Sequence, residues 1–277
     1  MKGVTVATST TFIDGRQILS QQLRALTLQG ELFSACDILL ITPSGPDVPP
    51  STYVSAKEKV KVFSGLGFRV RSIMANRLAP QNWEGARHIF YIAQNPIRID
   101  DLPASFRAAA TNLDDVSPFP EFSGSSAVVE AVMRCIDGAG APLAPCVVIG
   151  ARGRVGGRVS LLLKARGVSV RGVDIGDDLG TGLGDATTVV AATGSPWLVR
   201  AEMLGPKCQL VLDVGYHYDE HTGQGRGDVS SECYSLPLTI SPVPGGVGPL
   251  QVLTLVERAV ARIQGATYVP WSLRLNG

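Results

Sequence analysis

Residues 146–156 read CVVIGARGRVG, a short apolar run followed by three glycines at intervals of three. The apolar run predicts a buried strand, and the sequence after the glycines predicts a helix that Gly167 ends. A second apolar run, Val168 to Val173, follows that glycine. Strand, glycine loop, helix and strand therefore succeed one another within about 30 residues, which predicts a βαβ unit of the kind that binds dinucleotides in Rossmann-like folds.

Glycines in the first loop of such a unit let the backbone approach a phosphate, while the amides and dipole of the following helix attract negative charge. The spacing GxxGxxG differs from the usual GxGxxG, so the alternative is a tight turn whose glycines serve packing alone. We predict that the loop binds a nicotinamide cofactor through Gly150, Ala151, Arg152, Gly153, Arg154, Val155 and Gly156.

Two kinds of side chain around this loop favour different cofactors. Asp174 ends the second strand, where an acidic residue hydrogen-bonds the adenosine ribose and repels a 2′-phosphate, which favours NAD. Arg152 and Arg154 favour NADP, because a guanidinium can hold that phosphate through two hydrogen bonds. The residues leave the choice of cofactor open, with a preference for NAD.

The rest of the chain predicts more strands and helices around this unit. The final helix is amphipathic, since its apolar residues repeat at intervals of three and four. Strands are expected at residues 36–42, 88–93, 188–192 and 209–214, and helices at residues 13–30, after a Ser51 cap, and at residues 251–263.

This order of elements predicts an α/β protein of two domains with a hinge in the polar residues 114–126. We expect an N-terminal α/β catalytic domain at residues 1–120. A doubly wound, Rossmann-like NAD(P)-binding domain is expected at residues 121–250. The C-terminal helical segment, residues 251–277, is expected to pack back on the first domain.

The composition agrees with globular domains and a small-molecule ligand. The 277 residues are 45% hydrophobic and 18% charged, which excludes a disordered chain or a coiled coil. The net charge is +1 without a basic tract, so we expect no nucleic acid and no membrane as partner. Because the N-terminus lacks the apolar segment of a signal peptide, we expect the cytoplasm. The five scattered cysteines predict buried free thiols and no metal site.

Tyr53 and Lys57 form a candidate catalytic pair. They are four residues apart, so on a helix they share one face. A lysine whose ammonium group is partly desolvated can lose its proton near neutral pH and act as a general acid or base beside a phenol. The alternative is an exposed lysine that lies over an aromatic ring.

The loop at residues 241–249, SPVPGGVGP, is unusually rich in glycine and proline. Proline fixes the shape of the backbone, and glycine offers it bare to a ligand. This combination predicts a loop that faces a flat ligand.

These segments together resemble one family along nearly the whole chain, the FolD-type bifunctional methylenetetrahydrofolate dehydrogenase/cyclohydrolases. The PVPGGVGP stretch matches the family signature, and STYV at residues 51–54 with Lys57 and Lys59 is similar to its SxxYVxxKxK helix. Shorter matches are IDGR at residues 13–16, QNP at 94–96, VIGA and VG within 148–156, ATGSP at 192–196, LDVG at 212–215 and GDV at 227–229.

The resemblance implies two α/β domains with the active site in a cleft between them, and a homodimer. It also implies hydride transfer from 5,10-methylenetetrahydrofolate to NAD(P)+, and hydrolysis of the methenyl product to 10-formyltetrahydrofolate. The hydride step chiefly requires that two rings are held face to face. Hydrolysis requires proton transfer, for which a lysine is suited.

The family assigns roles to individual residues of this chain. Lys57 is the implied catalytic residue, Gln94 orients it, and Tyr53 packs against the folate. Thr193, Gly194 and Gly215 join the glycine loop and Asp174 in the cofactor site. The other implied folate-binding residues are Asp115, Ser117, Pro244, Gly245, Gly246, Val247, Gly248 and Pro249.

Departures from the family pattern concentrate on substrate and cofactor positions. The second aspartate of the family's KDVDG motif falls on Ser117, which cannot supply an anionic acceptor, and Asp115 is the expected substitute. Arg152 replaces a serine in the glycine loop, and Asp174 replaces a basic or polar residue. These changes keep two alternatives open: a paralogue that acts on a different pterin or one-carbon adduct, and a dinucleotide- or folate-binding protein without catalysis.

Overall fold

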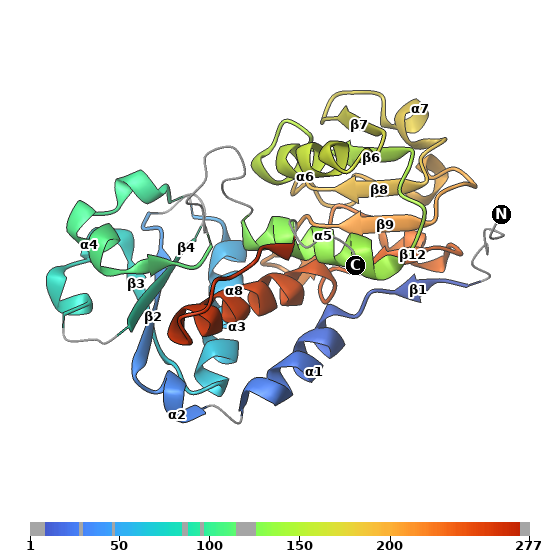
Figure 1. Cartoon of the computed structure of the whole chain (residues 1–277). Helices are drawn as coiled ribbons and strands as arrows, with labels where there is room; N and C mark the ends of the chain where they lie inside the picture. The colour runs from blue at the N-terminus through green and yellow to red at the C-terminus, as the bar shows by residue number, and fades with distance from the viewer. Residues whose placement is uncertain are drawn as a thin grey trace. The chain divides into compact units, whose positions relative to one another are not determined.

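Figure 1 shows the computed structural model of the chain, which describes residues 9–27, 30–45, 48–84, 88–94, 97–114 and 126–271. The chain divides into two compact units, each an α/β body with its own parallel sheet, as the sequence predicts. The larger unit contains the chain up to Ile18, Val128–Gln251 and the residues from Pro270 on, and the smaller unit contains Leu19–Ala127 and Val252–Val269.

The larger unit is built on six parallel strands in the order β1-β12-β9-β8-β6-β7. From β6 the chain passes through α6 to β7 on one side and returns to β8 on the other, a doubly wound order in which ligands bind at the carboxyl ends of the strands. Its elements are β1 (Thr11–Phe12), α5 (Ala127–Ala139), β6 (Cys146–Ile149), α6 (Arg154–Ala165), β7 (Val170–Val173), α7 (Leu179–Leu183), β8 (Thr188–Ala191), η4 (Ala201–Met203), β9 (Leu210–Asp213), η5 (Ser231–Ser235) and β12 (Thr239–Ser241).

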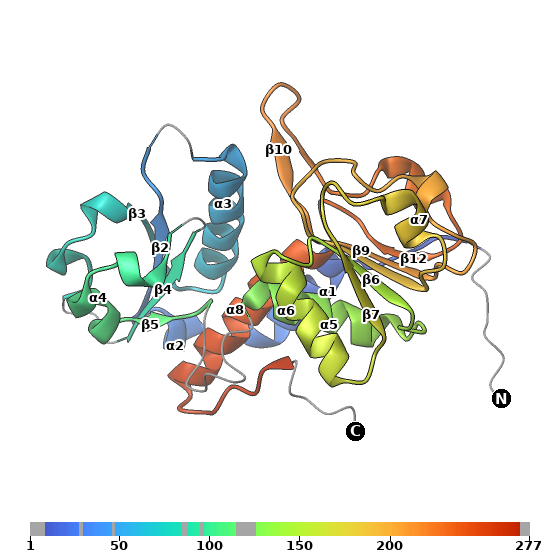
Figure 2. The ribbon, with the colours of Figure 1, turned by 90° about the horizontal axis from the view of Figure 1, so that it is seen from above.

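A two-stranded antiparallel hairpin, β10 (His217–Asp219) and β11 (Gln224–Arg226), projects from this unit in Figure 2. Arg226 joins the hairpin to the loop after β8. Its guanidinium group donates to Asp219 at 2.8 Å and lies 4.4 Å from the ring centroid of Trp197. The ion pair joins the two strands of the hairpin, and the cation–π contact ties the hairpin to the loop after β8.

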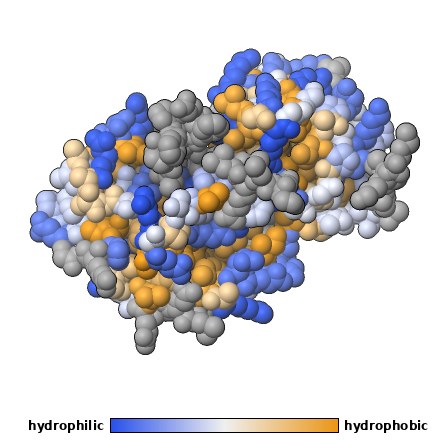
Figure 3. Space-filling view, in the orientation of Figure 1, coloured by the Kyte–Doolittle hydropathy of each residue, from blue (hydrophilic) through white to orange (hydrophobic). Residues whose placement is uncertain are grey.

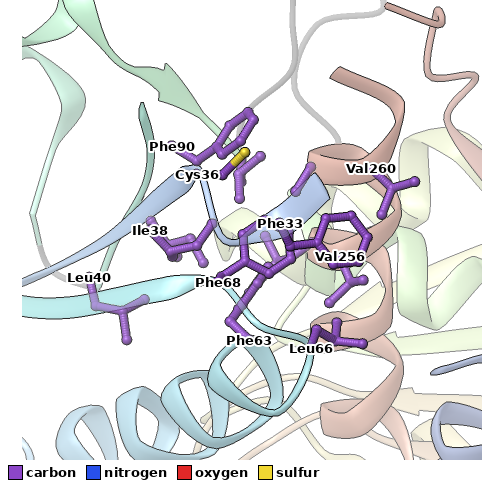
Figure 4. Close-up of a cluster of buried hydrophobic side chains, with 14 of the residues drawn as sticks. Phe33, Cys36, Ile38, Leu40, Phe63, Leu66, Phe68, Phe90, Val256 and Val260 are labelled. Carbon is purple, nitrogen blue, oxygen red and sulfur yellow. The ribbon is translucent and has the colours of Figure 1, made fainter. Parts of the chain in front are cut away.

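The smaller unit has four parallel strands in the order β3-β2-β4-β5, and α3 packs along β2 and β3 (Figure 2). Its core, shown in Figure 4, holds a stacked pair of rings, Phe33 and Phe68, with centroids 4.7 Å apart. Val256 and Val260 of α8 pack into the same core. The elements are α2 (Gly30–Phe33), β2 (Cys36–Thr42), α3 (Pro50–Gly65), β3 (Arg69–Met74), η1 (Ala75–Arg77), η2 (Pro80–Asn82), β4 (His88–Ala93), η3 (Ile99–Asp101), α4 (Ala104–Ala109) and β5 (Thr111–Asn112); α1 (Gly15–Thr27) and α8 (Val247–Ile263) each have residues in both units.

The structure differs from the sequence prediction at several element ends. Helix α3 starts at Pro50 with Pro49 as its N-cap, so Ser51 lies inside the first turn and does not cap it. Helix α8 starts at Val247, four residues earlier than expected, because Pro249 is tolerated in a first helical turn. The helix predicted over residues 13–30 is the shorter α1, and Asp14 caps it by accepting the amide of Gln17 at 2.9 Å.

The N-terminal residues contribute to the larger sheet. Thr11 and Phe12 pair with Thr239 and Ile240 of β12. The sequence assigns residues 1–120 to the first domain, whereas in the structure the described residues up to Ile18 lie in the unit that holds the glycine loop. A two-residue edge strand carries too weak an alternation of apolar and polar residues to be predicted.

All five cysteines are free and buried, as the sequence predicts. Burial raises the pKa of the Cys146 thiol to about 12, so this thiol stays protonated. Within the described ranges, no helix has the length and apolar character that crossing a bilayer would require.

Candidate active site

The loop after β6 contains the predicted phosphate-binding glycines. Gly150 adopts a φ of +83°, and a Cβ there would lie 2.6 Å from the carbonyl oxygen of Ala192. A Cβ on Gly156 would lie 2.3 Å from the carbonyl oxygen of Gly150. Backbone packing alone therefore requires these two glycines. Gly153 is different, because it is exposed and is the N-cap of α6, so no side chain covers a helix terminus whose amides and dipole suit a phosphate.

Arg152 and Asp174, which favour different cofactors, are bound to each other. The backbone amide of Arg152 donates to Asp174 Oδ1 at 3.2 Å, and its Nε lies 3.5 Å from Asp174 Oδ2. The Arg152 side chain is 81% exposed and that of Asp174 only 19%. The carboxylate is thus fixed at the end of β7, while the guanidinium group extends into solvent.

Thr193 and Gly194, predicted to contact the cofactor, form a turn after β8 that is bound to Asp228. Asp228 Oδ2 accepts the amides of Thr193 and Gly194 at 2.5 and 3.2 Å and the Thr193 hydroxyl at 2.8 Å. The Asp228 side chain is fully buried. Burial raises the pKa of this carboxyl, and the hydrogen bonds from Thr193 and Gly194 partly offset that rise.

A second buried carboxyl, that of Asp213, lies next to Asp228 at the end of β9. Asp213 accepts the backbone amides of Asp228 and Val229, both at 2.9 Å. Glycine is required on both sides of this pair, because a Cβ on Gly215 would lie 1.8 Å from Asp228 Oδ1 and one on Gly227 would lie 1.8 Å from Asp213 Oδ2. The predicted cofactor residue Gly215 thus packs against a carboxyl.

The Asp213 carboxyl gives the fold a pH dependence. Burial raises its pKa to about 8, and the neighbouring charge of Asp228 adds to the rise. The folded state therefore holds a proton that the unfolded state has lost, and the free energy of unfolding falls as the pH rises from about 4 to about 8. We predict that urea midpoints measured at pH 5, 6, 7 and 8 fall more steeply for the wild-type protein than for Asp213→Asn.

Only the two slopes are compared in this experiment. Asparagine offers the amides of Asp228 and Val229 one acceptor oxygen instead of two, which lowers stability at every pH without changing the slope. Equal slopes in the two proteins would show that Asp213 is already ionised at pH 5.

The glycine- and proline-rich loop leads from β12 into α8. The amide of Gly246 donates to the carbonyl oxygen of Pro242 at 2.8 Å, and the amide of Val243 donates to the hydroxyl of Tyr234 at 3.2 Å. A Cβ on Gly15 would lie 1.9 Å from the carbonyl oxygen of Gly246. The family segments IDGR, at residues 13–16, and PVPGGVGP, at residues 242–249, are therefore in backbone contact within the larger unit.

The remaining members of the predicted folate loop differ in exposure. Pro244 and Gly248 are exposed, whereas Val247, the first residue of α8, is buried. The peptide bond between Val243 and Pro244 is cis, and Gly245 adopts a φ of +123°. The loop thus presents backbone and proline ring at its surface.

The predicted catalytic residues of the smaller unit lie on α3 and at the end of β4. Tyr53 is 39% exposed and Lys57 is also exposed, one turn further along α3, so the two share an exposed face. Figure 3 shows one face of the surface, on which hydrophobic and hydrophilic residues are interspersed. Gln94 is buried, and its backbone amide donates to the backbone carbonyl oxygen of Ile41 at 2.8 Å. No hydrogen bond joins the side chains of Gln94 and Lys57, both of which lie in the described part of the chain.

The desolvated lysine of α3 is Lys59. Its side chain is buried, and Nζ donates to the Ser55 hydroxyl at 2.6 Å. Burial lowers its pKa to about 8, and the charge of Asp114 acts in the opposite direction. The sequence argument for Lys57 rests on desolvation, and in the structure that property belongs to its neighbour. Helical phase could have revealed this, since Ala56, Lys59 and Phe63 repeat at the spacing of a buried face.

Other sequence predictions lie beyond what the structure describes. Asp115 and Ser117, the candidate folate-binding residues, fall outside the described residues, as do Asn95 and Pro96. Asp114, which precedes the first of them, accepts the amide of Ala127 at 2.9 Å, and the buried guanidinium group of Arg258 donates to its carbonyl oxygen at 2.9 Å.

Comparison with known proteins explains why these segments occur together. The family described as "Tetrahydrofolate dehydrogenase/cyclohydrolase, NAD(P)-binding domain" matches residues 126–267. A protein named "Bifunctional protein FolD" from Herminiimonas arsenicoxydans is 30% identical over 285 aligned residues, which cover 92% of this chain and 98% of that protein. The chain belongs to the FolD family.

Other FolD-family proteins match to different extents. "Bifunctional protein FolD 1" from Salinispora arenicola is 34% identical, but the match covers 49% of this chain and about half, 48%, of that protein. FolD structures share the fold across nearly the whole chain. The Campylobacter jejuni enzyme has a TM-score of 0.70 at 22% identity, covering 92% of this chain and 99% of its own. The Trypanosoma brucei enzyme has a TM-score of 0.71 at 22% identity, covering 93% and 98%.

Proposed function

We propose that this FolD-family chain oxidises 5,10-methylenetetrahydrofolate with NAD(P)+ and hydrolyses the methenyl product to 10-formyltetrahydrofolate. The observation that carries the proposal is the exposed face of α3 shared by Tyr53 and Lys57. Family membership supports it, since the relatives that match over most of the chain are named as bifunctional FolD proteins and methylenetetrahydrofolate dehydrogenase/cyclohydrolases.

The first step is a hydride transfer in which the protein chiefly positions the reactants. The methylene carbon loses a hydrogen with its electron pair, and the lone pairs of the folate nitrogens stabilise the cation that remains. The bound cofactor supplies the carbon that accepts the hydride. We assign Tyr53 to packing against the folate ring, and the backbone of residues 244–249 to lining its pocket.

The second step adds water to the methenyl carbon, and here we assign the proton transfer to Lys57. Its uncharged amine accepts the first proton of the attacking water and passes it to the folate nitrogen as the carbon–nitrogen bond breaks, and the hydroxyl proton is released to solvent as the formyl carbonyl forms. Lys57 is exposed, so its amine would be desolvated by the substrate that packs on Tyr53. In this proposal Gln94 keeps its implied role as the residue that orients Lys57.

We propose NAD as the preferred cofactor. The Asp174 carboxylate is held in place by the Arg152 amide, where it can accept hydrogen bonds from a ribose and repel a 2′-phosphate. The Arg152 guanidinium group, which would bind the phosphate of NADP, has its Nε 3.5 Å from Asp174 Oδ2, so a phosphate bound there would lie beside the carboxylate. Named structural relatives include one complexed with NADP and one described as NAD-dependent, so the family allows either cofactor.

A matrix of initial rates tests the proposal. Purified protein is assayed with NAD+ and NADP+ against 5,10-methylenetetrahydrofolate, with reduced cofactor followed by absorbance at about 340 nm and hydrolysis followed by the loss of methenyl absorbance. We expect turnover with NAD+ at a higher kcat/KM than with NADP+. An absence of turnover with both cofactors would refute the dehydrogenase proposal.

A second candidate is a paralogue that acts on a modified pterin or another one-carbon adduct. Ser117, where the family has an aspartate that grips the pterin amino edge, is the observation that favours it. The variant Ser117→Asp, included in the same matrix, separates the two. A lower KM for ordinary folate in the variant would favour the modified pterin, whereas tight folate binding by the wild-type protein would count against it.

Two further expectations stay predictions. One is a location in the cytoplasm, and the other, implied by the resemblance to the family, is assembly as a homodimer. Size-exclusion chromatography with light scattering would test the homodimer.

A further inference from the structure

The turn that connects β8 to Val199 directs hydrogen-bond donors toward the interior of the larger unit. In a doubly wound sheet, the amides of a loop at the carboxyl ends of the strands can face a ligand. Here the amides of Thr193 and Gly194 and the Thr193 hydroxyl all donate to a single oxygen, Oδ2 of the buried Asp228. One carboxylate oxygen thus satisfies three donors of this turn.

The segment that carries Asp228 also binds the far end of the turn. The amide of Trp197 donates to the carbonyl oxygen of Gly227 at 3.0 Å, and the amide of Val199 donates to the carbonyl oxygen of Asp228 at 2.9 Å. Val199 and Val229 form a parallel bridge. Residues 227–229 therefore run alongside 197–199, and the Asp228 side chain reaches from there to Thr193.

Trp197 has a backbone conformation that needs such support. Its φ of +59° is in the left-handed region, which a bulky side chain rarely adopts. Strained residues of this kind persist where neighbouring contacts over-determine them, and they concentrate at ligand-binding sites. The bonds to Gly227 and Asp228 on either side of Trp197 supply those contacts.

The buried position of the Asp228 carboxyl lowers the stability of the fold. Its Oδ1 is buried and has no hydrogen-bond partner among the described residues, and it lies where a side chain at position 215 would be. A buried carboxylate oxygen without a donor is destabilising. A role in function accounts for this arrangement better than a contribution to stability does.

On the side away from Asp228, the turn is open at Gly194. It is exposed, its φ is +72°, and a Cβ there would have nothing within 4 Å. The inward bonds to Asp228 therefore leave open space and bare backbone at Gly194, in the turn that follows β8. The glycine loop follows β6, the strand that pairs with β8.

We infer that Asp228 is a positioning residue of the cofactor site: by accepting the amides of Thr193 and Gly194 it fixes the turn so that its open side receives the nicotinamide cofactor. The inference rests on the proposed function, because it concerns the same cofactor. It adds a residue that does not contact the cofactor and acts through Thr193 and Gly194.

Two substitutions at one position test this inference. Asp228→Ala leaves three donors without an acceptor, and Asp228→Asn keeps an acceptor oxygen in the same place. For Asp228→Ala we expect the Kd for NAD+, measured by calorimetry without folate, to rise about 10-fold or more, with the KM for the folate substrate changed less than about 2-fold. Asp228→Asn is expected to return the Kd to within about 3-fold of the wild-type value.

Glu232→Ala is the matched control, because Glu232 also accepts a backbone amide, that of Ala201, but on the surface of the same unit. Its Kd is expected to equal that of the wild-type protein. If Asp228→Ala does not fold, as judged by circular dichroism, Thr193→Val loosens the same turn, because it removes the hydroxyl that donates inward to Asp228 Oδ2 at 2.8 Å. It is expected to raise the Kd for NAD+ in the same selective way.

The outcomes separate this inference from the proposed function. A wild-type protein that binds neither NAD+ nor NADP+ refutes the proposed function and the inference with it. A wild-type protein that binds NAD+, with an unchanged Kd in Asp228→Ala, or in Thr193→Val if that variant replaces it, overturns the inference alone. An equal loss of cofactor and folate binding would also overturn it, because it would indicate a general structural role.

Discussion

Replacing Lys57 by methionine is expected to abolish hydrolysis of the methenyl product while hydride transfer continues. General acid–base catalysis contributes about 100- to 10,000-fold to a rate, so the hydrolysis rate should fall by at least about 100-fold. Hydride transfer depends on the positioning of rings, and we expect its kcat to fall no more than about 10-fold. The two rates are measured separately, by the loss of methenyl absorbance and by the formation of reduced cofactor.

A control variant for Lys57→Met is available on the same helix. Lys61 is exposed and lies one turn further along the same face of α3, so Lys61→Met removes the same charge without removing the proposed proton acceptor. We expect this variant to hydrolyse the methenyl compound at the wild-type rate. An unchanged hydrolysis rate in Lys57→Met would remove Lys57 from its proposed role.

Lys59 provides a discriminating comparison, since its pKa of about 8 is suited to proton transfer near neutral pH. If Lys59→Met loses hydrolysis and Lys57→Met does not, the proton acceptor is the buried lysine. Because the pKa of Lys59 is lower in the folded than in the unfolded state, its burial costs stability below about pH 8, and this cost disappears as the pH rises to about 10.5. Comparing the urea midpoints of wild-type protein and Lys59→Met over that range separates its effect on stability from any effect on catalysis.

The sequence predicts the strands β2, β4, β6, β7, β8 and β9, because their apolar runs are unambiguous, but it misses β3, whose residues are largely exposed. The boundaries of β2 and β4 are those predicted, and β6 is followed by the expected helix and strand, whereas the sequence does not predict helix α5 before it. Element ends that depend on caps are predicted less well. Ser51 is a good N-cap by residue type, but Pro49 takes that position because its fixed φ and the following proline start the helix earlier.

The sequence locates the segments of the candidate site better than it identifies their contacts. GDV and LDVG are recognisable as family segments, yet the pattern alone gives no sign that Asp228 reaches back to Thr193, 35 residues earlier in the chain. Likewise, the spacing of Tyr53 and Lys57 predicts a shared face without showing which lysine of the helix is buried. Side-chain contacts between distant segments depend on the packing of the sheet, and periodicity carries no information about them.

The change Asp174→Ser is expected to reverse the choice of cofactor. It removes the carboxylate that would repel a 2′-phosphate, and it releases the Arg152 guanidinium group from its contact at 3.5 Å. A hydrogen bond to a charged group contributes about 1.5–3 kcal/mol, or about 10- to 100-fold in affinity. Loss of the ribose contacts of NAD and gain of phosphate contacts with NADP should together change the ratio of kcat/KM for the two cofactors by about 100-fold or more.

Two further variants decide whether Arg152 is responsible for that reversal. Adding Arg152→Gln to Asp174→Ser should remove the gain with NADP and leave the loss with NAD unchanged, because only the phosphate contact depends on the guanidinium group. Asp185→Ser is the matched control, since it breaks another ion pair of the same unit, with Arg171 at 3.4 Å, between two exposed side chains. The ratio should stay at its wild-type value in this control. If Asp174→Ser leaves the ratio unchanged, the carboxylate does not face the ribose, and the preference for NAD must come from elsewhere in the glycine loop.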